Sequence, residues 1–103
     1  MLFCSRVMLA KHGFKIDIAE TGNDAMRMKN SNIYDLVILD YYLPDTTGDH
    51  VAIQIREFDK DIYIIGNSCA WDKDKARYCG LNDHTRRELD ACIEKYLNSK
   101  KQR

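Results

Sequence analysis

The sequence predicts a three-layer α/β sandwich with a mainly parallel sheet. Two short apolar runs, 36–39 and 62–65, have the unbroken hydrophobic pattern of strands that are covered on both faces. Segments with helical spacing alternate with strands along the chain, which is typical of helices that pack on both faces of one sheet. From the length of 103 residues we expect one domain with a single core and no separate output module.

The first third of the chain predicts a helix, a strand and a second helix. Apolar residues at helical spacing cover 2–10, and Gly13 follows as a stop signal. Ile16 and Ile18 alternate with charged residues, as in a strand near a sheet edge. A capping pair three residues apart then begins a short helix, which we expect to end near 30–32. The capping residues are Thr21 and Asp24.

Three further helices are predicted around the strand at 62–65. A helix over about 70–79 is closed by Gly80 and carries two aromatic residues, which are either core side chains or partner contacts. The last helix begins at a capping box, 85–88, and its apolar repeat continues to 98–99. The helix before strand 62–65 has an apolar face of Val51, Ala52, Ile55 and Phe58. The two aromatic residues are Trp71 and Tyr78.

One carboxylate is predicted to lie where an open parallel sheet keeps its ligands. Asp40 directly follows the buried run 36–39, and ligands bind outside the carboxyl ends of such strands. Pro44 fixes a backbone angle in the following loop, and Gly48 permits a conformation that other residues resist. A bland interpretation also exists, in which Asp40 only starts a turn.

The spacing of Asp40, Pro44 and Gly48 resembles the phosphoacceptor segment of response-regulator receiver domains. Residues 13–25 look like the second strand and following helix of this family, and residues 62–68 look like its fourth strand, which ends in a hydroxyl residue. The resemblance implies a flavodoxin-like fold. We expect one receiver-like domain over 1–98 and a solvated basic tail over 99–103.

The resemblance also implies a chemistry. Asp40 would accept a phosphoryl group from the histidine of a kinase or phosphotransfer protein, and Ser68 would sense that group through its hydroxyl. Magnesium is the usual cation, and Asp40 and the backbone carbonyl of Tyr42 match two positions that hold it in the family. Asn67 is a further candidate donor to the phosphoryl group. Ser68 has an equally ordinary interpretation, in which it starts a loop.

The chain also departs from the family pattern. It begins at what looks like the helix after the first strand, so the acidic pair that ends that strand is missing, and Asp17 and Glu20 do not match those positions. No apolar fifth strand with its lysine and proline follows Gly80. Arg86 or Arg87 would replace this lysine, or would be solvated surface residues. We therefore expect a sheet shortened at its first and fifth strands and an incomplete magnesium site, weak or absent.

A missing first strand would leave a gap in the middle of the sheet. Three arrangements would close the gap: the second and third strands pair directly, residues 2–9 form a replacement strand, or another chain fills the space. Unpaired strand edges favour self-association, including a strand-swapped dimer.

Composition excludes several other classes of function. Lys and Arg together number 16, as do Asp and Glu, so no pervasive basic field marks a nucleic-acid binder. The four cysteines lack zinc-like or disulfide spacing, which favours reduced thiols in a cytoplasmic protein, and no segment has the length of a membrane span. His12, His50 and His84 share no motif, so we expect surface or helix-end roles for them.

The sequence thus predicts a non-enzymatic receiver of a two-component phosphorelay, with a histidine kinase and a downstream effector protein as partners. The alternative is a pseudo-receiver that binds proteins without being phosphorylated; the absent acidic pair and lysine favour it. A phosphatase with an aspartate nucleophile fits less well, because Tyr42 stands where such enzymes usually carry a second carboxylate.

Overall fold

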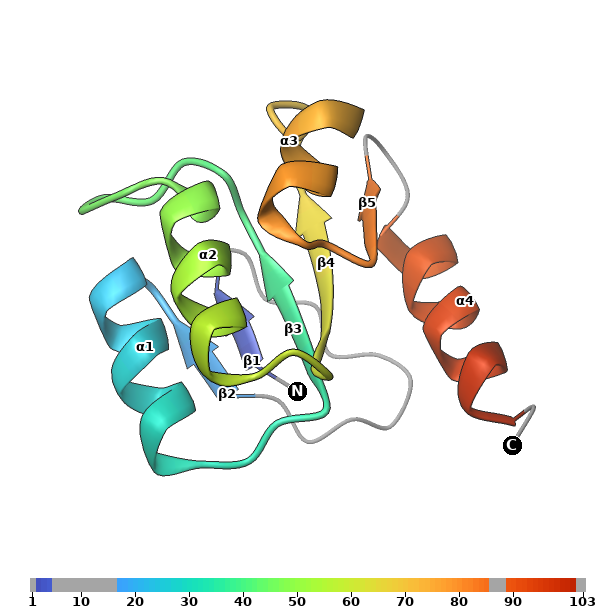
Figure 1. Ribbon diagram of the computed structural model, residues 1–103, viewed down its shortest axis with the longest axis horizontal. Helices are drawn as coiled ribbons and strands as arrows, with labels where there is room; N and C mark the ends of the chain where they lie inside the picture. Colours follow the sequence, from blue (N-terminus) through green and yellow to red (C-terminus); the bar gives the residue numbers. More distant parts are fainter. Residues whose placement is uncertain (1, 5–16, 86–88, 102–103) are drawn as a thin grey trace.

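The computed structural model describes residues 2–4, 17–85 and 89–101, and within them one five-stranded parallel sheet is flanked by four helices (Figure 1). The strand order is β2-β1-β3-β4-β5, and every neighbouring pair is parallel. The strands are β1 (Leu2–Cys4), β2 (Asp17–Ala19), β3 (Leu36–Leu39), β4 (Tyr63–Asn67) and β5 (Asp83–Thr85). The helices are α1 (Gly22–Ser31), α2 (Gly48–Phe58), α3 (Lys73–Cys79) and α4 (Leu89–Lys101). The predicted fold class is confirmed.

Strand β3 carries a core on each of its faces. Val37 and Leu39 point to the core that contains the buried residues of α1, α2 and α3, whereas Leu36 and Ile38 point to the core beneath α4. All four side chains are fully buried, because successive side chains of a strand face opposite sides and helices cover both. In Figure 1, α4 accordingly stands apart from α1, α2 and α3.

The predicted gap in the sheet is wrong. Leu2–Cys4, which we assigned to a helix, form β1 at the centre of the sheet, where Leu2 is in register with Asp17 on one side and Val37 on the other. A central strand pairs its backbone groups on both edges, which a short helix at this place could not do. We considered three arrangements, and the structure has the one in which the first residues form a strand. The gap is therefore closed within the chain, and it no longer supports a strand-swapped dimer. The predicted helix beyond Cys4 lies outside the described residues.

No apolar fifth strand was predicted after Gly80, and the structure has a short polar strand there. β5 pairs with β4 through Ile65↔Asp83 and Asn67↔Thr85, and it escaped notice because it is a short, polar edge strand. Thr85 is therefore the last residue of a strand, and the rest of the predicted capping box, 86–88, lies outside the described residues, so the cap stays a prediction. α4 continues to Lys101, so the first part of the predicted tail is helical.

The other helix signals are mostly confirmed. Thr21 Oγ1 accepts a hydrogen bond from the Asp24 backbone N–H, and Gly80 ends α3 with a left-handed φ of 77°. α3 starts three residues later than predicted, because Asp72 is its N-cap. Phe58 is 81% exposed and does not belong to the buried face of α2.

Arg56 ties the end of α2 to the beginning of β4. Its guanidinium donates four hydrogen bonds, and all of the acceptors are neutral. These are the backbone oxygens of Gly80 at 2.8 Å, Ile62 at 2.7 Å and Asp59 at 3.2 Å, and Asn82 Oδ1 at 2.9 Å. The same Asn82 oxygen accepts from the backbone N–H of Ile64 at 2.9 Å. Partial burial lowers the pKa of Arg56.

We expect Arg56→Met to reduce the free energy of unfolding by about 2–3 kcal/mol, because it leaves several part-buried acceptors without a donor. The measurement is urea denaturation followed by circular dichroism. Arg77→Met, which changes an exposed arginine of α3 in the same way, should cost clearly less. Equal losses for the two variants would contradict a structural role for the Arg56 contacts.

Candidate functional site

Asp40 lies at the carboxyl edge of the sheet, directly after β3. Leu39 is in register with Gly66, so the next residues, Asp40 and Asn67, end neighbouring strands. Asn67 Nδ2 lies 3.5 Å from Asp40 Oδ1, and both side chains are half-buried. A carboxylate and an amide donor thus lie together at the ends of two neighbouring strands, and the ligand roles expected for Asp40 and Asn67 stay predictions.

The loop between β3 and α2 is closed by its own backbone. Leu43 N donates to Thr46 O at 3.1 Å, Gly48 N donates to Tyr41 O, and Tyr42 and Thr47 form an isolated antiparallel bridge. These two hydrogen bonds use the carbonyls of Tyr41 and Thr46, and neither uses the carbonyl of Tyr42. The loop therefore has a defined shape next to Asp40.

Gly48 is needed for close packing and not for an unusual backbone angle. A Cβ atom at this position would lie 2.3 Å from Asp40 O and 2.7 Å from Trp71 Cζ2. Among the described glycines, Gly80 is the one with a positive φ, so the conformational reason that we gave for Gly48 is wrong. The first residue of α2 instead packs directly against the backbone of Asp40.

Trp71 fills the space beneath this loop. Its side chain is fully buried, its Nε1 donates to Leu39 O at 3.0 Å, and its ring meets the Tyr41 ring edge-on with centroids 5.1 Å apart. Lys75 Nζ lies 4.6 Å from the centroid of the same Tyr41 ring. We expected Trp71 and Tyr78 to be either core side chains or partner contacts. Trp71 is a core residue, and it lies in the loop before α3. Tyr78 is 83% exposed.

Ser68 begins the loop that leads from β4 to α3. Its Oγ accepts a hydrogen bond from the Ala70 backbone N–H at 3.0 Å, and its carbonyl accepts from Trp71 N at 3.2 Å. Acceptance by Oγ uses a lone pair, and the O–H of the same hydroxyl is a donor. The structure thus shows the ordinary loop-starting interaction of Ser68, and a role in sensing a phosphoryl group stays a prediction.

The groups near Asp40 that could bind magnesium are of the right chemical type, because they are oxygen donors, but they are few. Magnesium prefers hard oxygen ligands, keeps several waters and is often held by one or two carboxylates together with phosphate oxygens. The Asp40 carboxylate and the Tyr42 carbonyl are donors of this kind. In the described part of the chain, no three His, Cys, Asp or Glu side chains gather as a metal cluster. The residues that follow β1 in the sequence, 5–16, include no Asp or Glu, and their structure lies outside the described residues.

The remaining candidates lie elsewhere. Asp17 begins β2 at the opposite edge of the sheet, where its carboxylate accepts from Tyr34 Oη at 2.7 Å, and burial together with this bond raises the pKa of Tyr34 to about 12. His50 is in α2, where its Nδ1 lies 3.2 Å from Oγ1 of the N-cap residue Thr47, and His84 is in β5. Three further candidates, His12, Arg86 and Arg87, lie outside the described residues.

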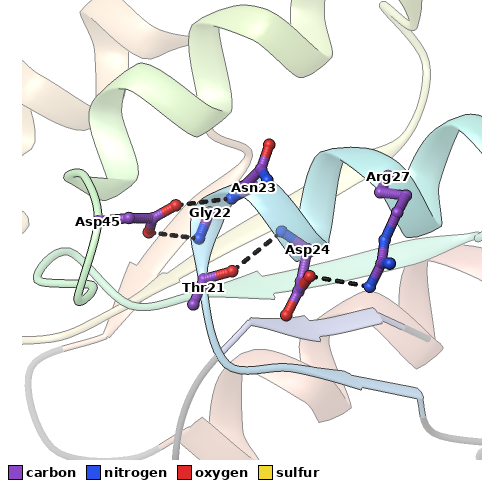
Figure 2. A network of polar contacts seen from close by, with 6 residues as sticks. All are labelled: Thr21, Gly22, Asn23, Asp24, Arg27 and Asp45. Atoms are coloured by element: carbon purple, nitrogen blue, oxygen red, sulfur yellow. Dashed lines mark hydrogen bonds and ion pairs between the residues drawn. The ribbon is translucent and has the colours of Figure 1, made fainter.

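Sequence reasoning missed Asp45. Its carboxylate reaches from the loop after β3 to the first residues of α1, where it accepts from Gly22 N at 2.8 Å and Asn23 N at 2.9 Å (Figure 2). Hydrogen bonds from Asn23 and Gly22 lower the pKa of Asp45. Asp45 lies more than twenty positions from Gly22 and Asn23, so no local pattern could have paired them. The one signal in the sequence was that Thr21 could cap Asp24 but left the N–H groups of Gly22 and Asn23 without a partner.

A doubly wound parallel sheet in the order β2-β1-β3-β4-β5 defines a flavodoxin-like α/β domain, a fold class in which ligands bind outside the carboxyl ends of the strands. Asp40 lies at this edge of the sheet. The model of the response regulator receiver domain family matches residues 1–98. The chain belongs to this family, and it is a receiver domain of the two-component signalling type.

Similar curated proteins include the transcriptional regulatory protein DltR of Streptococcus agalactiae serotype III, which is 29% identical over 89 residues; these cover 84% of this chain and 40% of DltR. The sensor protein ArcB of Escherichia coli K12 is 40% identical over 53 residues, which cover 52% of this chain and 7% of ArcB. The chain thus spans less than half the length of either protein.

Solved receiver structures share the fold. The response regulator TrrA of Thermotoga maritima, in complex with Mg2+-BeF, is 32% identical, and the match covers 84% of this chain and 77% of that chain at a TM-score of 0.73. A CheY-like receiver domain of Methanospirillum hungatei has a TM-score of 0.76, with 87% and 78% coverage. It is 14% identical, so this second likeness concerns the fold alone.

We expect Gly48→Ala to destabilise the domain by about 1–3 kcal/mol, because the added methyl group must displace the Asp40 backbone or the Trp71 ring. Urea denaturation measures the loss, and backbone NMR signals of residues 39–41 and 71 should move together. Unchanged stability with unmoved signals at Asp40 and Trp71 would contradict the close packing.

Proposed function

We propose that this receiver domain accepts a phosphoryl group on Asp40 from a histidine kinase or a histidine phosphotransfer protein. The observation that carries the proposal is the position of Asp40: the carboxylate lies half-buried at the carboxyl end of a central strand, within 3.5 Å of the Asn67 amide and beside a loop closed by backbone bonds. Membership of the receiver family supports the same role.

In the proposed step, a carboxylate oxygen of Asp40 attacks the phosphorus of a phosphohistidine. The new O–P bond forms as the P–N bond breaks, and the electron pair returns to the imidazole, which takes up a proton from solvent. Asn67 Nδ2, 3.5 Å from Asp40 Oδ1, would donate a hydrogen bond to a phosphoryl oxygen. Asp40 and the Tyr42 carbonyl would hold magnesium, which when bound supplies positive charge to the phosphoryl oxygens.

The modified residue would then act through the loop that follows β4. Ser68 begins this loop, and Trp71 connects it to Leu39 and Tyr41 at the end of β3. A hydrogen bond from the Ser68 hydroxyl to the phosphoryl group would favour one arrangement of the segment before α3, and an effector protein that distinguishes the arrangements would read it. The domain works in this scheme as a phosphorylated signalling module and not as an enzyme with steady turnover.

The location of the protein is part of the proposal. In the portion of the chain that the structure describes, no helix has the length and apolar character needed to cross a bilayer. The proposed phosphotransfer from a kinase that uses ATP would require the domain to lie in the cytoplasm.

Acetyl phosphate with magnesium is expected to add one phosphoryl group to the protein, and Asp40→Asn should abolish the gain, because an amide is not a comparable nucleophile. Intact-mass spectrometry measures the adduct. The matched control is Asp35→Asn, which changes an exposed aspartate before the other end of the same strand and should leave the adduct unchanged.

No adduct on the folded, unaltered protein, either with acetyl phosphate or after incubation with phosphorylated kinases, would contradict the proposal. Such a result would favour a pseudo-receiver that binds partners without being phosphorylated. Steady phosphate release from a generic ester that depends on Asp40 would point to a phosphatase instead.

The role of Ser68 is tested separately. Ser68→Ala should still form the adduct but should lose most of the change in Trp71 fluorescence that beryllofluoride and magnesium cause in the unaltered protein, because the hydroxyl that reports the group is absent. Ser68→Thr, which keeps the hydroxyl, should retain the change. An identical fluorescence response in the alanine variant would show that the hydroxyl does not sense the group.

A further inference from the structure

The carboxylate of Asp45 completes the start of a helix that belongs to another part of the chain. The first turn of a helix leaves backbone N–H groups without partners inside the helix. In α1, the N–H of Asp24 is taken by Thr21 Oγ1 at 3.0 Å, and the N–H of Ala25 bonds to Thr21 O. The two remaining groups, at Gly22 and Asn23, donate to Oδ1 and Oδ2 of Asp45 (Figure 2).

The electrostatics of this contact favour the charged carboxylate. The N-terminus of a helix carries partial positive charge, and an anion there is stabilised. Both oxygens of Asp45 are engaged by backbone donors, which lowers the pKa of Asp45 and keeps it ionised at neutral pH. The contact therefore depends on the carboxylate as a bridging anion, and an amide at the same position could accept through one oxygen only.

The loop also packs closely on α1 at this point. A Cβ atom at Gly22 would lie 2.4 Å from Thr46 Cγ2 and 3.0 Å from Val51 Cγ2, so no side chain could stand between the helix and the loop. Asp45 and Thr46 thus dock on the first residue of α1 with hydrogen bonds and with direct contact.

The docked segment is the one that borders the acceptor residue. Asp45 lies between Leu43 and Thr46, whose backbones are hydrogen-bonded to each other at 3.1 Å, and the outer bond of Gly48 N to Tyr41 O closes the same loop. Tyr42, whose carbonyl would face a cation, lies between these two bonds. A shift of Asp45 would therefore be passed through the backbone to Tyr42 and to the contact of Gly48 with Asp40.

From this geometry we propose that Asp45 is a positioning residue for the phosphoacceptor site: its carboxylate anchors the loop 41–47 to the N-terminus of α1 and so holds the Tyr42 carbonyl in place beside Asp40. The inference deepens the proposed function and rests on it. Asp45 acts through the loop and not by contact with the phosphoryl group.

A simpler role would be that of a helix cap that only stabilises α1. The two roles differ in what they predict for a variant that is still folded. A cap alone affects the free energy of unfolding, whereas a positioning residue also changes the structure of residues 41–48 and the response of the site to a phosphoryl mimic.

The test compares Asp45→Asn with Asp24→Asn. Both variants remove one negative charge near the start of α1, but the Asp24 carboxylate bonds to Arg27 at 2.8 Å within the helix and does not hold the loop. Two quantities are measured on the folded proteins: the backbone NMR signals of residues 41–48 without ligand, and the half-saturating concentration of beryllofluoride in magnesium, followed by Trp71 fluorescence.

For Asp45→Asn we expect displaced signals across residues 41–48, faster amide exchange at Gly22 and Asn23, and a half-saturating concentration raised about tenfold, which corresponds to about 1.4 kcal/mol. Asp24→Asn should leave the loop signals in place and change the concentration less than about twofold. If Asp45→Asn lowers the thermal midpoint but leaves the loop signals and the beryllofluoride response unchanged, the inference is overturned.

The two proposals can fail separately. If the unaltered protein forms no phosphoryl adduct and does not respond to beryllofluoride, the proposed function fails, and the loop signals alone then decide whether Asp45 positions residues 41–48. If Asp45→Asn does not fold, Asp45→Glu replaces it, because this variant keeps an anion for Gly22 and Asn23 on a longer side chain. Displaced loop signals in a folded Asp45→Glu protein support the inference, and unmoved signals overturn it.

Discussion

The candidate site depends above all on how closely other elements approach the end of β3. The Trp71 indole donates to Leu39 O, the last backbone carbonyl of the strand, and Gly48 leaves no room for a methyl group between α2 and the Asp40 backbone. These two contacts fix the strand end from the side of β4 and from the side of α2. Asp40 therefore follows a strand end that is held by close packing and a hydrogen bond. A change in either contact would move the Asp40 carboxylate.

The same dense packing explains how the site and the surface near α3 are joined. Trp71 and Ser68 belong to one short loop, and Tyr41 lies between the Trp71 ring and Lys75 of α3. A change in the bonds made by the Ser68 hydroxyl would act on a loop whose aromatic residue already touches the strand end. The proposed signal thus has a short, contiguous route through packed side chains.

Two polar side chains link elements that the chain order keeps apart. Arg56 bonds to the backbone of Gly80 at the end of α3 and of Ile62 just before β4, and Asp45 bonds to the backbone of Gly22 and Asn23 at the start of α1. Each of these side chains bonds to backbone groups that have no partner within their own helix or strand. Backbone groups in folded proteins generally need such partners. Neither pairing has a local sequence signal, because each joins residues more than five positions apart through the fold.

The sequence by itself determined the alternation of strands and helices, the buried character of β3, the caps at Thr21 and Gly80, and the place of Asp40 at a strand end. These features follow from local periodicity and local backbone preference, which a single segment carries. Only the tertiary structure decided that Leu2–Cys4 form a central strand, that Asp83–Thr85 form an edge strand, that Phe58 is exposed and that Asp45 holds α1. Short strands take their pairing from neighbours in space, and the exposure of a side chain and the partner of a carboxylate likewise depend on residues far away in the chain.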